Sequence, residues 1–237
     1  MIQKYPYTKL GDAQHGWLHA RYHFSFARYV DRSKMGFPPL RVWNDDIIQA
    51  QTGFPTHPHQ NMEIITYVKE GAITHEDSMG NKGRTEAGQI QIMSAGSGIT
   101  HSEYNLEDTE TKLFQIWIEP SKMNIQPRWE TLSLSDISTK ESINLLASGR
   151  EIHKGKTSIE IYQDAAIYVI TVQKNESLQC PFENNRHGYG VVSKGTLSIN
   201  NIEFSKGDGL YIFKEDKPTI QGQDDINELV FVDLPIL

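Results

Sequence analysis

Two pairs of potential metal ligands lie in short stretches of the sequence, and each pair has the spacing of residues on one face of a β-strand. The first pair is His57 and His59 in the stretch FPTHPHQNME, and the second is His101 and Glu103 in ITHSEYN. Side chains two residues apart on a strand point to the same face, so each pair converges on one spot. Glu63 has the same parity as His59 and would face the same interior if that strand continued regularly.

This combination of side chains suits a particular class of ion. Imidazole nitrogens with one carboxylate bind divalent transition metals, and four protein ligands on an octahedral ion leave positions open for water, substrate or dioxygen. A lone His-x-His pair is weak evidence, because surface strands often carry alternating polar residues, but the second pair strengthens the prediction of a metal site. Spacing alone leaves Glu63 and Glu103 both open as the carboxylate ligand.

The surrounding sequence predicts many short antiparallel strands. Segments 64–68, 89–93 and 112–118 alternate with period two and are punctuated by glycine. A weak repeat, in which VKEGAI is echoed by VSKGTL further along the chain, indicates that one β-barrel fold is used twice. Asn200 and Asn201 predict a tight hairpin turn in the second copy, because paired asparagines tolerate the left-handed backbone. The expected class is therefore all-β, with two domains.

The repeat also predicts that the second domain lacks the ligand set. His57 and His59 lie 14 and 12 residues before Gly71. The same offsets before Gly195, the equivalent glycine of the repeat, reach Pro181 and Glu183. The offsets that lead to His101 and Glu103 reach two residues without metal-binding side chains, which are Ile220 and Gly222.

Composition excludes several functions. Lys and Arg number 23 against 30 Asp and Glu, which gives a net charge of −7, and no basic run is long enough to track phosphates, so we expect no direct nucleic-acid contact. The lone Cys180 fits a reducing compartment, and no apolar stretch has the character of a signal peptide or a membrane span. We expect a cytoplasmic protein that does not contact membranes.

The motifs resemble those of a known family. Residues 53–59 with Glu63 and Gly71 resemble the first cupin motif, and residues 88–105 resemble the second. More narrowly, HPH, HEDSMG and MSAGSGITHSEYN, preceded by HGWL and FSFARY, are similar to the pirin family, and within it to the bacterial pirin-like quercetin dioxygenases. The resemblance implies an all-β bicupin with one metal in the N-terminal barrel. Because the sequence becomes polar, Ser/Thr-rich and without clear alternation around residues 120–148, we place the domain connection there and expect an N-terminal cupin domain with the metal site over residues 1–130 and a C-terminal cupin domain without the ligand set over residues 131–237.

The resemblance also implies a site and an activity. The metal ligands would be His57, His59, His101 and Glu103, and the ion would be Fe(II) first, with Mn, Ni, Co, Cu or Zn as alternatives. The reaction would be cleavage of the central ring of a flavonol such as quercetin by O2, with release of CO and with Glu103 as both ligand and base.

Supporting residues and a second function follow from the same resemblance. Glu63 would hydrogen-bond a ligand or the strand, and Phe24 and Phe26 are candidate walls for a flat substrate. His75 and Asp77 form a further pair beside a turn, for which we expect a structural role. The alternative function is a metal-containing, redox-responsive regulatory protein that binds a protein partner. We expect a monomer in either case.

Overall fold

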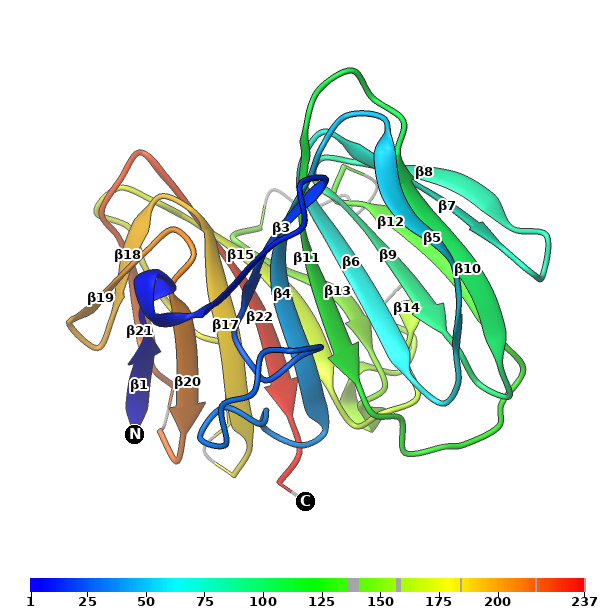
Figure 1. Cartoon of the computed structure of the whole chain (residues 1–237). Coiled ribbons are helices and arrows are strands. Elements are labelled where there is room, and N and C mark those ends of the chain that lie inside the picture. Colours follow the sequence, from blue (N-terminus) through cyan, green and yellow to red (C-terminus); the bar gives the residue numbers. More distant parts are fainter. Residues whose placement is uncertain (136–140, 157–158, 184, 216, 237) are drawn as a thin grey trace. The chain divides into compact units, whose positions relative to one another are not determined.

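The computed structural model describes residues 1–135, 141–156, 159–183, 185–215 and 217–236 (Figure 1). The described chain is built of strands, and its helices are two single-turn 3-10 segments, η1 and η2. It divides into two compact units. The N-terminal unit comprises Gly11–Asp136 and Ile161–Gln163, and the C-terminal unit comprises Met1–Leu10, Ile137–Glu160 and Asp164–Leu237.

The N-terminal unit contains a seven-stranded sheet, in the order β12-β9-β6-β11-β4-β3-β2, and a four-stranded sheet, in the order β5-β10-β7-β8. All of its strand pairs are antiparallel. The strands are β2 (Gly11–Gln14), β3 (Leu18–Tyr22), β4 (Leu40–Ile48), β5 (Thr52–His59), β6 (Glu63–Glu70), β7 (Ala72–Asp77), β8 (Lys82–Glu86), β9 (Gln89–Ser94), β10 (Ile99–Asn105), β11 (Thr111–Ile118) and β12 (Arg128–Ser133).

The C-terminal unit repeats this plan, with sheets in the orders β1-β20-β17-β22-β15-β13-β14 and β16-β21-β18-β19. Its elements are β1 (Ile2–Tyr5), η1 (Tyr7–Lys9), β13 (Ile143–Ser148), η2 (Glu151–His153), β14 (Ile159–Glu160), β15 (Ala166–Gln173), β16 (Ser177–Gln179), β17 (His187–Lys194), β18 (Thr196–Ile199), β19 (Ile202–Ser205), β20 (Gly209–Phe213), β21 (Thr219–Gly222) and β22 (Ile226–Leu234).

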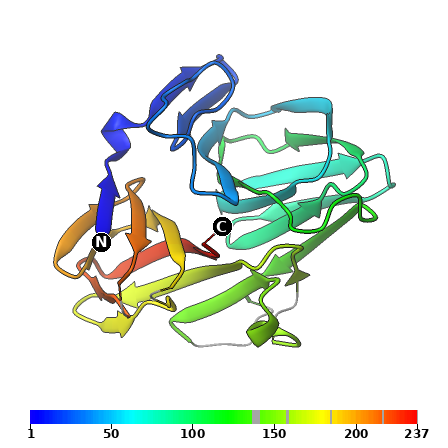
Figure 2. The same ribbon diagram turned by 90° about the horizontal axis from the view of Figure 1, so that it is seen from below.

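The predicted division assigns residues 1–130 to the N-terminal domain, but in the structure residues 1–10 belong to the C-terminal unit. Strand β1 pairs with β20, so the first ten residues belong to the C-terminal unit, and both ribbon views show β1 beside β20 (Figures 1 and 2). In the N-terminal unit the equivalent edge position, beside β9, is taken by β12. The physical reason is that an open strand edge leaves backbone N–H and C=O groups unpaired. In the N-terminal unit β12 pairs with the edge strand β9, and in the C-terminal unit β1 pairs with the edge strand β20.

The predicted local structure is confirmed. Segments 64–68, 89–93 and 112–118 lie within β6, β9 and β11. Asn200 and Asn201 have φ angles of 45° and 66° in the β18–β19 turn, as a tight hairpin with a left-handed backbone requires. Gly71 and Gly195 occupy equivalent turns with φ of 77° and 71°, which supports the repeat.

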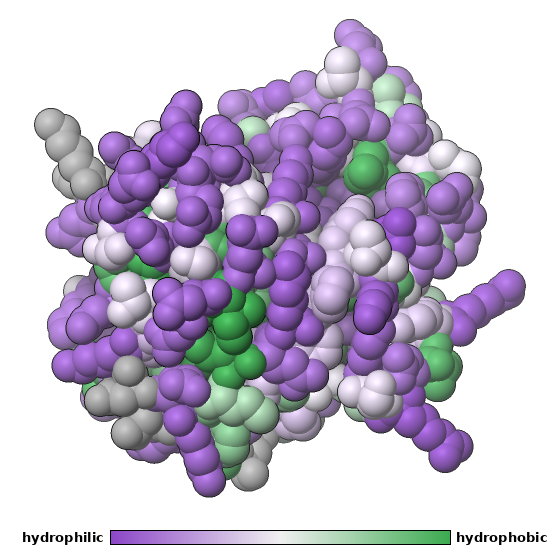
Figure 3. Space-filling view, turned by 90° about the vertical axis from the view of Figure 1, so that its left-hand side faces the viewer, coloured by the Kyte–Doolittle hydropathy of each residue, from purple (hydrophilic) through white to green (hydrophobic). Residues whose placement is uncertain are grey.

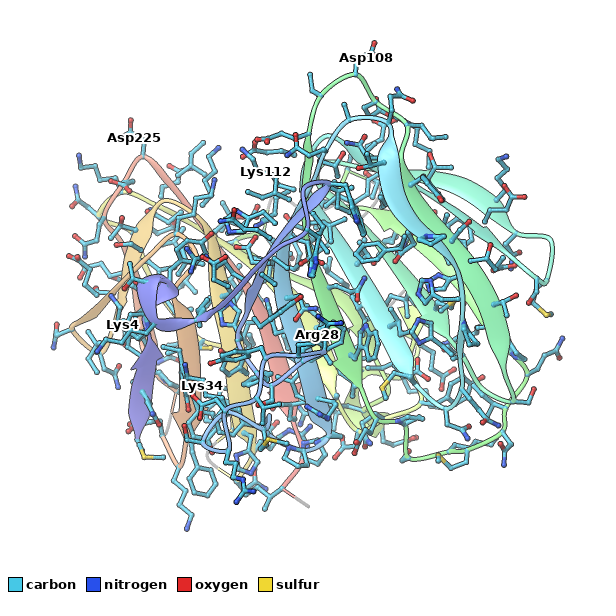
Figure 4. All side chains as sticks on the ribbon, viewed as in Figure 1. Lys4, Arg28, Lys34, Asp108, Lys112 and Asp225 are labelled. Carbon is cyan, nitrogen blue, oxygen red and sulfur yellow. The ribbon has the colours of Figure 1, made fainter. Side chains whose placement is uncertain are left out.

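Corresponding loops also carry charged tips. Figure 4 shows Asp108 on the loop between β10 and β11 and Asp225 on the loop between β21 and β22, each pointing away from its strands. Hydrophilic side chains predominate on the face in Figure 3, in agreement with the mean hydropathy of −0.50. Among the described residues, no helix is long and apolar enough to cross a membrane.

Candidate metal centre

Strands β5 and β10 bring three of the predicted ligands together. The strands pair antiparallel with His101 directly opposite His57, and the Nε2 atoms of these imidazoles lie 3.1 Å apart. The centroid of the His59 ring lies 4.8 Å from that of His57 and 5.0 Å from that of His101. One nitrogen from each ring lies within 4.8 Å of the other two. The alternation of side chains along each strand thus produces a cluster of three imidazoles.

Glu103 reaches the interior from the same face of β10 as His101. Both side chains are buried, at 3% and 2% exposed, whereas Thr100, Ser102 and Tyr104 on the opposite face are not. The β5–β10 register shifts between His101 and Glu103, where a Cβ atom on Gly53 would lie 2.2 Å from the Glu103 carbonyl oxygen. Glycine is therefore needed for this close approach of the two strands.

Hydrogen bonds fix the tautomers of two imidazoles. The Nδ1 atom of His57 lies 2.7 Å from the carbonyl oxygen of Pro55, which can only accept, so Nδ1 carries the proton and Nε2 has a free lone pair. The Nδ1 atom of His101 lies 3.3 Å from Nδ1 of His75, whose Nε2 lies 3.0 Å from Asp77 Oδ2. When His75 Nε2 donates to Asp77, His75 Nδ1 is left as an acceptor for the proton on His101 Nδ1. The Nε2 atom of His101 then also keeps a free lone pair. Both Nε2 atoms then face each other as electron-pair donors.

Burial keeps two of these imidazoles, those of His101 and His59, neutral. It lowers the pKa of His101 to about 2, an effect reinforced by His57, His59 and His75. The pKa of His59 is lowered to about 4, again by burial first and by His57 second. Neutral imidazole is the form that binds a metal ion, so at neutral pH His59 and His101 are in their ligating state.

Glu103 is held as an acceptor by three donors. Thr66 Oγ1 and Gln91 Nε2 donate to Oε1 at 3.3 and 2.5 Å, and Gln115 Nε2 donates to Oε2 at 3.4 Å. Trp117 Nε1 donates to Oε1 of Gln115 at 3.1 Å, which orients that amide. Burial raises the pKa of Glu103 to about 7, and the bonds from Thr66 and Gln91 oppose the rise. A nearby cation would favour the ionised form further.

The residues fit a divalent transition ion. Nitrogens bound at about 2.0–2.1 Å to one ion lie about 3 Å apart when the ligands are at right angles, and the His57 and His101 Nε2 atoms are 3.1 Å apart. A carboxylate oxygen of Glu103 lies within 4.8 Å of a ring nitrogen of His101. Neutral imidazoles with one carboxylate are the donor set that iron, nickel, copper and zinc accept.

Glu63 lies on the opposite face of its sheet from the histidines. The strand does not continue regularly past His59, because Asn61 has a φ of 49° and Glu63 starts β6 in the other sheet. The Glu63 carboxylate accepts a hydrogen bond from Ser94 Oγ at 2.7 Å, and burial raises its pKa to about 7. Thr66, of opposite parity on β6, is the residue that reaches Glu103.

A cavity of about 380 Å³ opens beside the imidazoles. Phe26 lines it and packs edge-to-face on Trp117, with ring centroids 5.4 Å apart. Phe24, the other candidate wall, is outside the lining and packs against Phe37. The lining combines apolar walls with a polar floor, and it consists of Leu18, Ala20, Tyr22, Phe26, Asn44, Asp46, Phe54, Pro55, Thr56, His57, His59, Gln115 and Trp117.

Sequence reasoning missed several residues around the centre. The alternating pattern places Gln91, Gln115 and Trp117 on strands and gives them no further role. A glutamine inside an otherwise apolar run is nevertheless a usable signal of a buried polar contact. His75 is fully buried, stacks on Trp129 with ring centroids 4.9 Å apart, and forms a second potential trio with His101 and Glu103. Within the described parts of the C-terminal unit, no comparable group of three ligands is found.

Comparisons with known proteins agree with this picture. The family model described as Pirin matches residues 5–118, and the model described as Quercetinase C-terminal cupin domain matches residues 145–234. A protein of Escherichia coli strain K12 named quercetin 2,3-dioxygenase is 44% identical over 236 residues, which is 99% of each chain. A pirin-like protein of Caulobacter vibrioides is 46% identical over 233 residues, covering 98% of this chain and 99% of that protein.

A solved structure extends the similarity to three dimensions. The crystal structure of the bacterial pirin YhhW from Escherichia coli in complex with nickel(II) matches with a TM-score of 0.92 at 41% identity, covering 100% of both chains. With both halves matched in sequence and in structure, the predicted fold of two cupin domains is confirmed, and the chain belongs to the pirin family.

Proposed function

We propose that this chain is a metal-dependent dioxygenase that opens the central ring of a flavonol such as quercetin with O2 and releases CO. The observation that carries the proposal is the cavity, whose apolar walls lead to His57 and His59. Its volume of about 380 Å³ is in the range of small-molecule sites. The relatives named quercetin 2,3-dioxygenase support the same reaction class.

The four predicted ligands would hold one divalent ion. His57, His59 and His101 present ring nitrogens and Glu103 presents its carboxylate. We propose Fe(II) as the native ion, and the nickel(II) in the similar Escherichia coli pirin supports a site for divalent transition metals. When bound, such an ion supplies Lewis-acid and redox chemistry, which acidifies the flavonol 3-hydroxyl group and permits reaction with O2.

The protein side chains would bind the substrate and take its proton. A carboxylate with a pKa of about 7 is matched to proton transfer at neutral pH, so Glu103 is the proposed base for the 3-hydroxyl proton. The hydrogen bonds from Thr66, Gln91 and Gln115 keep its oxygens in place. Phe26 and Trp117 would contact the flat rings and exclude water from them.

The test is aerobic incubation of purified, metal-quantified protein with quercetin, in which the loss of visible absorbance and the release of CO are measured together. His101→Ala should abolish both signals. The matched control is His19→Ala, which removes a half-buried histidine of the same unit that pairs with Asp12 at 3.0 Å and should leave turnover unchanged. No turnover with Fe, Mn, Ni, Co or Cu bound would contradict the proposal.

That negative result would favour the alternative function, a redox-responsive regulatory protein with a protein partner. For either function we propose a cytoplasmic monomer that does not contact membranes or bind nucleic acid directly. The net charge of −7 supports the last point. Size-exclusion chromatography with light scattering tests the oligomeric state.

A further inference from the structure

Two polar side chains form the floor of the cavity. Asn44 and Asp46 lie two residues apart on β4, so they share the inward face of the strand, and both line the cavity. They are 2% and 1% exposed. The Oδ1 atom of each is buried and has no hydrogen-bond partner among the residues that the structure describes.

Unpaired buried oxygens are uncommon because they are unfavourable. A buried acceptor without a partner destabilises a fold, because it has lost its hydrogen bonds to water and gained none in return. The other acid of the strand, Asp45, points to the opposite face and is paired with Lys69. Gln115, which lies opposite Asn44 on β11 and also lines the cavity, is paired with Glu103 and Trp117. Both of these neighbours have partners, whereas the Oδ1 atoms of Asn44 and Asp46, which line the cavity, have none among the described residues.

We propose that Asn44 Oδ1 and Asp46 Oδ1 accept hydrogen bonds from hydroxyl groups of the bound substrate, other than the oxygen that the metal takes. The inference rests on the proposed function and specifies its substrate class, an aromatic compound with at least two hydroxyl groups. The apolar walls select a flat ring, and the floor selects its substituents. A ligand without the additional hydroxyl groups would leave both oxygens unpaired in the complex, which is the strongest basis for discrimination in a closed site.

The test compares quercetin with 3-hydroxyflavone, which keeps the metal-binding oxygens and lacks the other hydroxyl groups. Affinities for the metal-free protein are measured by isothermal titration calorimetry, and kcat/KM is measured for the metal-loaded protein. We expect the wild type to prefer quercetin by roughly 10- to 100-fold in affinity, the factor that corresponds to one unpaired buried group. Asp46→Leu and Asn44→Leu should each lower the preference, and the double variant should bring it to within about threefold.

Stability distinguishes lost recognition from lost folding. Asp46→Leu removes the unpaired Oδ1 and keeps the branching and the number of side-chain heavy atoms, so its Tm should equal or exceed that of the wild type. Asp46→Asn keeps an acceptor and should retain most of the preference. The matched control Asp45→Asn changes the neighbouring acid on the opposite face, so it should lower Tm and leave the preference unchanged.

The outcomes separate this inference from the proposed function. A wild type that turns over quercetin, with a preference that Asp46→Leu and Asn44→Leu do not change, would overturn the inference alone. A wild type that shows no turnover, yet prefers quercetin in calorimetry through Asn44 and Asp46, would support the hydroxyl-binding floor and overturn the dioxygenase. Equal affinity of the wild type for both compounds would overturn the inference whatever the turnover.

Discussion

The two units have closely similar topologies and different interiors. Their smaller sheets match, β5-β10-β7-β8 with β16-β21-β18-β19, and their larger sheets differ at one edge, where β2 pairs antiparallel with β3 and β14 pairs parallel with β13. In the N-terminal unit the β5–β10 pair places His57 opposite His101, and in the C-terminal unit the β16–β21 pair places Leu178 opposite Ile220. The C-terminal interior is a cluster of buried apolar side chains that includes Ile170, Phe182, Leu197, Phe204, Ile220 and Phe231.

The difference shows that the fold does not depend on the metal centre. The C-terminal unit forms the same sheets around a packed hydrocarbon core, which is the more stable way to fill the space. The N-terminal unit instead encloses imidazoles, a carboxyl group and a cavity, and unpaired polar groups remain at the floor. Function is therefore located where the interior departs from good packing. The following predictions test that contrast.

The largest effect is expected at His101. His101→Ala removes the imidazole that contacts both His57 and His75, so bound metal should fall from about one ion per chain to less than about a tenth of that. The fold should persist, since the equivalent position of the other unit has no ligand. Metal analysis and circular dichroism measure the two properties, and full metal content in the variant would disprove the assignment.

A buried charge cluster is expected to dominate the stability of the C-terminal unit. Asp233 is fully buried and accepts hydrogen bonds from Arg150 Nη1 and from Arg186 Nε, the latter at 2.7 Å. Asp233→Ala leaves two buried guanidinium groups without this partner and should lower the free energy of unfolding by about 3–5 kcal/mol. Metal bound per folded chain should not change. Urea denaturation measures the loss, and the exposed Asp225→Ala is the control, with an effect within about 0.5 kcal/mol.

The pH dependence of stability should carry the signature of Glu63. Burial raises its pKa from 4.5 to about 7, so between these values the folded chain binds a proton that the unfolded chain has released. This carboxyl group alone therefore lowers the stability of the wild type as the pH rises through this window, by on the order of 3 kcal/mol. Glu63→Gln cannot titrate and should lack this loss. Denaturation at pH 4 and pH 8 tests the difference, and parallel profiles for the two proteins would contradict it.

The smallest effect is expected at Ile220, the counterpart of His101. Ile220→Val removes one buried methylene group and should lower the free energy of unfolding by about 0.5–1.5 kcal/mol. Metal content should be unchanged, which is the reverse of the result expected for His101→Ala. A loss of metal in Ile220→Val would show that the two interiors are coupled.

Local physics explains what the sequence predicts well. Alternation along a strand depends only on neighbouring residues, so the convergence of His57 with His59 and of His101 with Glu103 follows from the amino-acid sequence alone. The paired Asn200 and Asn201 encode their turn in the same way. The parity argument for Glu63 failed at one residue, Asn61, whose left-handed backbone ends the strand. A break of this kind has only a weak sequence signal.

Other features depend on contacts between distant residues. The segment 2–5 gives no sign in sequence that it pairs with 209–212. In the polar run at residues 44–46, Asp45 forms an ion pair with Lys69, whereas Asn44 and Asp46 each keep an unpaired Oδ1. The sequence of the run does not indicate this difference, because it depends on which side chains the neighbouring strands present. Tertiary contacts decide these points, and single-sequence patterns do not carry them.

The pairing of β1 with β20 has a consequence for synthesis on the ribosome. Residues 2–5 are synthesised about two hundred residues before their partners at 209–212. The N-terminal unit, whose strands lie between them, can fold during translation while β1 waits. The edge of the C-terminal sheet therefore cannot be completed until β20 has been made, and until β1 pairs with it the open side of β20 is an exposed template for strand addition.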